Sequence, residues 1–417
     1  MVRSDHVVDI KIRSEDGRIF SVGSYQVAGP ENHSMFGEAT VPHLLRVSPS
    51  GNELASFDGT KWEIRLRDLG PDADFDSYRS LAVGQIKERV HELRWIEDGK
   101  AIAIATDKQI LVVPTEAAAG RLVPTIIPLK LQAGYKVKSL RANEDGFYIV
   151  TQARGFFPNG NLRAYFVQSG RLDVVYELGP KDGTLVGLST RSDGRVVLAL
   201  RGAKSSRTVE FRTLSTTPGS FLNVLDSRPC EEDTCFVANW TPGTKRLAVA
   251  FHNGTLAWWN EKAGAKAERV VVRPGDPRGT PHSFWANADE DLYLAANKQQ
   301  VSVFRSDGTL AWTWKPLKGQ VHSAHFYEDQ QGVLVATSNG IVLVDGGHVK
   351  KTLTTFAPQN PSTANGRDAR SFPDDVKPLG SGAIAWQDVT ETRNMRFGRN
   401  VSKRPRLPRL APPQLKL

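Results

Sequence analysis

The pattern of hydrophobic and polar positions repeats along most of the chain. In each copy a short apolar segment ends in a tight turn rich in Asp, Glu and Gly, and a strongly apolar segment and then an alternating one follow. The second segment is apolar at consecutive positions, as in residues 102–104 and 196–200, which is typical of a strand buried on both faces. The third segment alternates, as in residues 62–68, which predicts a half-exposed strand. We interpret each copy, with these three segments and the residues that follow them, as a sheet of four antiparallel strands.

Seven copies are marked by the turn between the first and second strands. The turns fall at residues 51, 99, 146, 194, 243, about 290 and about 331, so the successive spacings are 48, 47, 48, 49, 47 and 41 residues. Most turns use Gly, which accepts a positive φ without a Cβ clash, whereas the sixth copy carries Asp289, Glu290 and Asp291 there. The predicted repeat units are 42–89, 90–135, 136–182, 183–231, 232–279, 280–319 and 320–356.

A four-stranded unit of this length, repeated seven times, predicts an all-β fold and a single β-propeller over residues 1–397. Two segments outside the units, 7–28 and 382–397, would close the ring and remove exposed sheet edges. If each terminus supplies one strand, the ring has seven blades; if each supplies two, it has eight, the last built from both termini. We expect seven. Residues 357–380 are rich in Pro, Asn, Ser and Asp, which predicts a flexible loop.

Two segments carry a resemblance to known propellers. Residues 42–70 resemble a degenerate WD40 blade, with His43, a Ser-Pro-Ser-Gly turn, Leu-Ala-Ser and Leu-Arg-Asp-Leu in the WD40 order. Residues 306–312, Ser-Asp-Gly-Thr-Leu-Ala-Trp, resemble the blade end of quinoprotein-like propellers. No copy ends in Trp-Asp, and the Gly-His pair of a good WD40 unit is absent. The resemblance covers residues 42–356 and implies the propeller superfamily without assigning a specific family.

The net charge of +9 is concentrated at the C-terminus. Residues 391–417 hold eight basic residues and one acid, Glu391, and so carry +7 of the total. Elsewhere the chain lacks a run of about 18 apolar residues, and its first residues lack the features of a secretion signal. Cys230 and Cys235 are too few for a disulfide framework. These features predict an intracellular, cytoplasmic protein, or a nuclear one if the source is eukaryotic.

Candidate chemistry is sparse in this sequence. It contains no nucleophile elbow, no phosphate-binding Gly-rich loop and no second cysteine pair to complete a zinc site. His43, His91 and His322 recur at one repeat position, which favours a structural hydrogen bond between strands. Acidic residues in the repeated turns, such as Asp16 and Asp307, are predicted to accept backbone hydrogen bonds. We expect no catalytic residue, cofactor or metal; a carboxylate pair at the central channel stays open as a propeller-enzyme alternative.

The basic C-terminal tail, residues 391–417, is the segment whose sequence points most specifically to a function. Its prolines prevent helix and sheet, which predicts an extended segment. The tail is either solvated, docked on an acidic partner through its leucines, or in contact with nucleic-acid phosphates. Adjacent Trp258 and Trp259 face opposite ways on a strand, so one is expected outside as a partner anchor. The candidate partner-binding residues are Arg399, Lys403, Arg404, Arg406, Leu407, Arg409, Leu410, Trp258 and Trp259.

These features favour a non-enzymatic β-propeller scaffold that mediates protein–protein interactions within a macromolecular complex, its tail docking an acidic partner. A nucleic-acid-associated subunit whose tail contacts phosphates is the alternative, and a propeller enzyme with a site at the central channel is the second alternative. No membrane association is expected, and the sequence leaves the oligomeric state open.

Overall fold

The computed structural model describes residues 3–27, 44–70, 73–86, 88–96, 99–106, 108–116, 124–129, 135–143, 146–153, 162–168, 171–178, 184–190, 196–201, 208–213, 223–229, 237–240, 248–251, 254–260, 268–272, 281–327, 332–355, 367–379 and 383–394. Within these ranges the regular structure is β-strand, from β1 to β32, arranged in four-stranded antiparallel sheets, eight in number. Over the same ranges no helix has the length and hydrophobicity to span a bilayer.

Seven of these sheets are built from four consecutive strands in chain order. Sheet by sheet, the strands are β3 (Leu45–Val47), β4 (Glu53–Asp58), β5 (Glu63–Asp68) and β6 (Arg79–Ala82); β7 (Val90–Ile96), β8 (Ala101–Thr106), β9 (Gln109–Pro114) and β10 (Thr125–Pro128); β11 (Tyr135–Asn143), β12 (Gly146–Ala153), β13 (Leu162–Gln168) and β14 (Arg171–Leu178); β15 (Thr184–Thr190), β16 (Val196–Arg201), β17 (Thr208–Thr213) and β18 (Asn223–Pro229); β19 (Val237–Trp240), β20 (Ala248–Phe251), β21 (Leu256–Asn260) and β22 (Glu268–Val272); β23 (Ser283–Ala286), β24 (Leu292–Ala296), β25 (Val301–Arg305) and β26 (Leu310–Trp314); β27 (Val321–Tyr327), β28 (Gly332–Thr337), β29 (Gly340–Asp345) and β30 (His348–Thr355).

The remaining sheet joins the two ends of the chain in the order β2-β1-β32-β31, and we call it the terminal sheet. It consists of β1 (Arg3–Arg13), β2 (Ile19–Val27), β31 (Arg367–Pro378) and β32 (Ile384–Asn394). The register of β1 and β32 runs from Arg3 opposite Asn394 to Arg13 opposite Ile384. The expectation of seven sheets with one strand from each terminus is therefore wrong for the described strands. Each end of the chain supplies two strands, as in the alternative.

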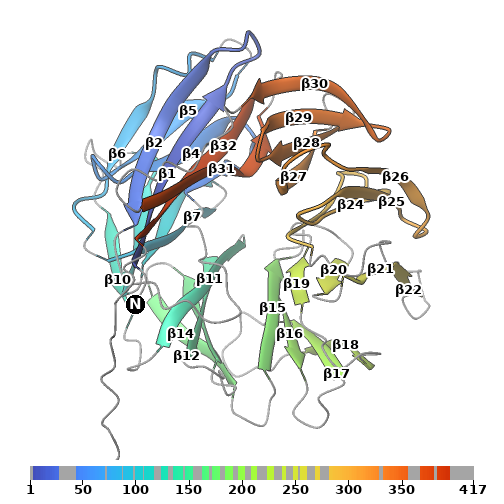
Figure 1. The fold of residues 1–417 in the computed structure, drawn as a ribbon. Coiled ribbons are helices and arrows are strands. Elements are labelled where there is room, and N and C mark those ends of the chain that lie inside the picture. The colour runs from blue at the N-terminus through green and yellow to red at the C-terminus, as the bar shows by residue number, and fades with distance from the viewer. Residues whose placement is uncertain are drawn as a thin grey trace, which may run out of the picture.

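The sheets follow one another around a central space (Figure 1). First strands of successive sheets contact each other from β3 and β7 through β23 and β27, and β27 contacts β31 of the terminal sheet. On the other side of the terminal sheet, β2 packs against β4. The chain thus forms a closed ring of four-stranded antiparallel sheets, which is the architecture of a β-propeller.

The second half of the expected flexible loop at 357–380 is instead strand β31, Arg367–Pro378. A strand forms there because its backbone pairs with β32 and it packs against β27 and β28, although few of its residues are apolar. Val376 is buried, and its N–H donates to Ser323 Oγ at 3.2 Å. The closing segment 382–397 contributes one strand, β32, of 11 residues, and the second strand from this end of the chain is β31. Residues 356–366 and 395–417 lie outside the described ranges.

The second strands whose side chains the structure describes in full are buried on both faces, as the sequence predicts. All six side chains of β8 are buried, and β4, β24 and β28 are buried at all but their first position. The prediction for the third strands is only half right. Arg65 and Arg67, on the polar face of β5, are 9 % and 3 % exposed. Alternation predicts a face exposed to water, but here both arginines of the polar face donate to the Val22 carbonyl on β2 of the terminal sheet.

Turn chemistry recurs from sheet to sheet. The side chains of Asp58, Thr106, Asn297 and Thr337 each end a second strand or directly follow one, and each accepts a hydrogen bond from a backbone N–H two residues further along the chain. Glu290 adopts a φ of 55° in the turn where Gly51 and Gly99 take 76° and 90° in their own copies. The sixth copy therefore keeps the left-handed turn without a glycine. Asp16 and Asp307 accept backbone N–H groups in their turns, as predicted.

Candidate functional site

An open hollow of about 690 Å³ lies at one end of the terminal sheet, beside the sheet of β3–β6. One wall is the β1–β2 turn, with Glu15, Asp16 and Arg18. The opposite wall is the segment that follows β5, with Gly70, Ala73 and Asp74. Phe20, Phe75 and Ala383 supply the apolar part of the lining, and Ala383 directly precedes β32. We call this site the acidic hollow.

The β1–β2 turn is held by its own polar groups. Ser14 N–H donates to the Arg18 carbonyl at 3.0 Å, and Gly17 completes the turn at a φ of 93°. Asp16 accepts hydrogen bonds from the Ser14 hydroxyl and the Arg18 N–H, and its carboxylate pairs with Arg18 Nε at 2.7 Å. These bonds, that of Ser14 first, lower the pKa of Asp16. The carboxylate of Asp16 is thus charged near neutral pH. The neighbouring side chain of Glu15 is exposed to solvent.

Carboxylates also shape the opposite wall. Asp68 accepts a hydrogen bond from Gly70 N–H at 2.8 Å, and Asp74 accepts one from Asp76 N–H at 3.1 Å. The second oxygen of Asp74 accepts from Ser77 Oγ at 2.7 Å, and this bond leads the contacts that lower the pKa of Asp74. The described residues of the two walls and their flanks, 13–18 and 68–76, contain five acids and two arginines. The rim of the hollow is therefore negatively charged at neutral pH.

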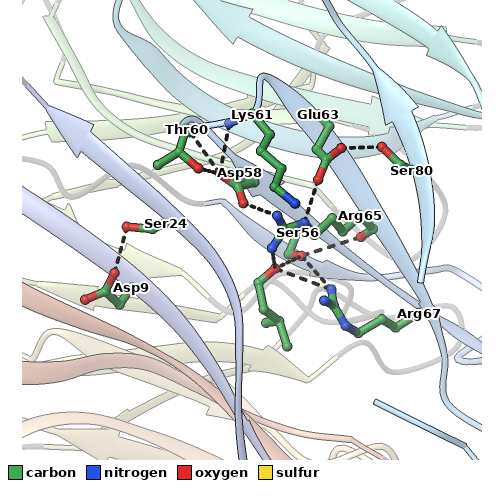
Figure 2. A network of polar contacts seen from close by, with 11 residues as sticks. Asp9, Ser24, Ser56, Asp58, Thr60, Lys61, Glu63, Arg65, Arg67 and Ser80 are labelled. Carbon is green, nitrogen blue, oxygen red and sulfur yellow. Dashed lines mark hydrogen bonds and ion pairs between the residues drawn. The ribbon is translucent and has the colours of Figure 1, made fainter. Parts of the chain in front are cut away.

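Figure 2 shows a buried polar network around Arg65 and Arg67, and Arg67 connects this network to one wall of the hollow. Arg67 on β5 donates to the Phe75 carbonyl of one wall at 3.0 Å and to the Val22 carbonyl on β2 at 3.4 Å. Val22 is free to accept because the register of β1 and β2 shifts there and leaves this residue outside the ladder. Ser56 and Arg65 donate to the same carbonyl at 3.1 and 3.4 Å. Strand β5, through Arg67, thus connects the Phe75 wall of the hollow to strand β2, which follows the turn that forms the other wall.

The two guanidinium groups of this network are neutralised differently. Arg65 forms ion pairs with Asp58 and with Glu63, the latter at 2.8 Å. Arg67 donates to backbone carbonyls and to Ser56 Oγ, and burial lowers its pKa to about 10, with the charge of Arg65 adding to the effect. Both groups lie 4.8 Å from the centroid of the Tyr78 ring. Arg67 therefore stays protonated at neutral pH and acts as a structural donor.

The arrangement suits binding of a basic, extended segment better than acid–base chemistry. A general acid needs a carboxyl pKa raised toward the working pH, whereas the pKa values of Asp16 and Asp74 are lowered. Arg18 already lies over the Phe20 ring at 5.6 Å, so the aromatic lining accepts a guanidinium. In the described ranges no three His, Cys, Asp or Glu side chains are grouped so as to hold a metal ion.

Of the predicted partner-binding residues, Trp258 is placed clearly. Its side chain is fully buried, stacks on Tyr293 of the next sheet at 4.4 Å and donates from Nε1 to the Ser306 carbonyl at 2.8 Å. It packs between sheets and is not accessible to a partner. The side chain of Trp259 lies outside the described residues, as do Cys230, Cys235 and the tail residues Arg399, Lys403, Arg404, Arg406, Leu407, Arg409 and Leu410.

The acidic hollow itself was not found by sequence reasoning. The signal was present in residues 68–76, Asp-Leu-Gly-Pro-Asp-Ala-Asp-Phe-Asp, where acids recur without a basic residue. From the sequence alone this run is typical of a solvated loop. Its role in the hollow depends on the β1–β2 turn, which lies opposite it in the fold. Of the recurring histidines, His322 lies within 3.0 Å of Ser338 Oγ, which fits the structural role predicted for this position.

Comparisons with known proteins give a fold and no family. No family model matches the chain, and no curated protein matches it in sequence. Among solved structures, Citrobacter koseri AztD aligns with a TM-score of 0.53 at 10 % identity, over 85 % of this chain and 95 % of that one. The C-terminal WD40 domain of Sif2 aligns with a TM-score of 0.52 at 15 % identity, over 84 % and 99 %. The chain is thus similar to propellers in fold, which agrees with the WD40-like sequence of residues 42–70.

Proposed function

We propose that this protein is a non-enzymatic, eight-bladed β-propeller scaffold that binds other proteins through the loops of the ring. The acidic hollow is its docking site for a basic, extended segment of a partner. The observation that supports this most directly is the hollow itself, about 690 Å³ in volume, with an apolar lining and an acidic rim.

The terminal sheet supports the count of eight blades in this proposal. A propeller closes when its last blade contacts its first, and here β31 contacts the preceding sheet while β2 packs on the following one. Such a ring gives rigid support to its surface loops, because each sheet is held between two neighbours. Rigidity suits docking, since an ordered site loses little conformational entropy when a partner binds.

The basic tail supplies the second interaction surface of the proposed scaffold. Its seven basic residues after Asn394 favour an acidic protein surface over an apolar one. Contact with nucleic-acid phosphates stays the alternative role of the tail. It predicts that binding falls steeply with salt, by about 0.9 log units per log unit of salt for each phosphate contacted.

The test compares capture of partners by two charge variants of the tagged full-length chain. In the hollow variant, Glu15→Gln with Asp74→Asn, the rim loses two charges while Asn keeps an acceptor for the Asp76 N–H. The control, Asp289→Asn with Asp307→Asn, removes two exposed charges from the distant β23–β26 sheet. We expect at least one protein to be captured by wild type and control and lost with the hollow variant, and to bind again when purified.

Partners that are retained equally by both variants would contradict the assignment of the hollow. A chain that captures no protein in any form would contradict the scaffold itself.

A further inference from the structure

We propose that the acidic hollow is occupied by the C-terminal segment of the same molecule, residues 395–417, when no partner is bound. This inference rests on the proposed function, because it names the basic segment for which the hollow is built. The segment would then act as a built-in competitor, and a partner would bind by displacing it.

Charge complementarity is the first argument. Residues 395–417 contain seven basic residues and no acid. The hollow presents Glu15, Asp16 and Asp74 around its rim, with Arg18 as the single lining cation among the described residues. At the C-terminal end of β32, by contrast, the backbone register places both Arg3 of β1 and Arg367 of β31 opposite Asn394. Attraction therefore directs the segment back along the terminal sheet toward its other end.

The length of the segment fits this path. The hollow lies at the start of β32, beside Ala383, and the segment leaves the ring at the far end, after Asn394. The 11 residues of β32 span about 33 Å at roughly 3.3 Å per residue. An extended, proline-rich chain rises about 3.1 Å per residue, so about 11 residues bring it back to the hollow. The residues that arrive there are near 405, within the run Lys403 to Leu410.

The chemistry of that run matches the lining. Arg404, Arg406 and Arg409 alternate with Leu407 and Leu410 and with prolines. A guanidinium group pairs with the rim carboxylates and stacks on an aromatic ring, as Arg18 does over Phe20 at 5.6 Å. The leucines find Phe20 and Phe75, whose ring centroids are 5.8 Å apart. Tethering to Asn394 gives an effective concentration of about millimolar order, so modest contacts suffice for occupancy.

Zero-length carbodiimide cross-linking of the purified full-length chain tests the proposal. The reagent joins a lysine to a carboxylate in contact with it, and we expect Lys403 to be linked to Glu15 or Asp74. An equimolar mixture of ¹⁴N and ¹⁵N chains tells cis from trans. We expect linked peptides of a single isotope, with a yield independent of protein concentration. Mixed-isotope peptides would show that a second copy supplies the segment, and links to other carboxylates alone would place it elsewhere; either result overturns the proposal.

Limited trypsin digestion gives a second readout that does not use cross-links. Occupancy protects the Arg406–Leu407 and Arg409–Leu410 bonds, so the hollow variant Glu15→Gln with Asp74→Asn should be cut there at least about threefold faster at low salt. The control Asp289→Asn with Asp307→Asn should match wild type, and high salt should remove the difference because it screens exposed charges. Equal rates in all three chains would overturn the inference. Partner capture that still depends on the hollow would leave the proposed function standing.

Discussion

At the scale of single residues, Arg67 has the largest expected effect. It is 3 % exposed and donates to the Phe75 and Val22 carbonyls and to Ser56 Oγ. Arg67→Met fills a similar volume but leaves the Phe75 carbonyl without this donor. We expect a loss of about 2–3 kcal/mol in the free energy of unfolding, because a buried acceptor without its partner costs about 1–3 kcal/mol.

Chemical denaturation of the full chain measures this loss, and Arg305→Met is the matched control. Arg305 also lies on a third strand but is exposed, so its substitution should change stability by less than about 0.5 kcal/mol. Equal effects of the two substitutions would show that the network of Figure 2 does not stabilise the ring. Arg67→Met should also be cut faster by trypsin after Arg406 and Arg409, as expected for the hollow variant, because the walls of the hollow depend on this side chain.

Asp58 links stability to pH. Burial alone would raise its pKa, but hydrogen bonds from Thr60 and Lys61 N–H and the charge of Arg65 lower it overall. A carboxyl whose folded pKa is depressed contributes stability above its unfolded pKa, near 3.9, and loses it as pH falls through the folded pKa. We therefore expect Asp58→Asn to be less stable than wild type at pH 7 by about 1–2 kcal/mol. The difference should shrink below about pH 4.

Urea unfolding at pH 7, 5, 4 and 3 follows this difference. Asp289→Asn, an exposed substitution in another sheet, serves as the control. A gap between Asp58→Asn and wild type that stays constant down to pH 3 would contradict the assigned role of the carboxylate.

At the scale of elements, the β29–β30 hairpin depends on Gly340. Its φ is 151°, and a Cβ there would lie 2.1 Å from the Thr354 carbonyl oxygen of β30. Gly340→Ala must push the two strands apart, so we expect a loss of more than about 2 kcal/mol in the free energy of unfolding. Gly346 in the same hairpin has a φ of 56° and nothing within 4 Å of its Cβ position. Gly346→Ala should cost about 1 kcal/mol, and denaturation midpoints that do not separate the two variants would contradict this account.

Elements also show which parts of the fold a sequence reveals. The repeated acid-glycine turns predict the four-stranded units, because turn chemistry and two-sided burial are local properties. Strand β31 escapes prediction, since Pro373, Asp374 and Lys377 give it no apolar pattern and its formation depends on pairing with β32. The burial of Arg65 and Arg67 is not predicted from the sequence for a related reason. Alternation fixes which side chains share a face, whereas the covering of that face by β2 is a property of the ring.

For the whole molecule, the ends of the chain matter as much as any repeat. The hollow arises only where the terminal sheet meets the sheet of β3–β6, so no single repeat unit contains it. Its walls come from the β1–β2 turn and from Gly70 with residues 73–75, and Ala383 is added from the opposite end of the chain. Ring closure, site formation and the exit point of the basic segment are thus consequences of the same pairing of β1 with β32.

Two truncations test this dependence at the scale of the whole ring. Removing residues 1–27 takes away β1 and β2, exposes the edge of β32 and uncovers the face of β4 and β5. Val8, Ile10, Ile12 and Val22, each 0 % exposed, are lost from the core. An unpaired strand edge promotes aggregation, and the loss of these core side chains removes apolar burial that stabilises the ring. We expect no soluble monomer by size-exclusion chromatography. Removing residues 395–417 leaves every described strand in place and should change the free energy of unfolding by less than about 1 kcal/mol, because exposed ion pairs contribute little each. A soluble 28–417 chain with wild-type stability would show that seven sheets close the ring without the N-terminal strands, and the eight-bladed assignment would then be wrong.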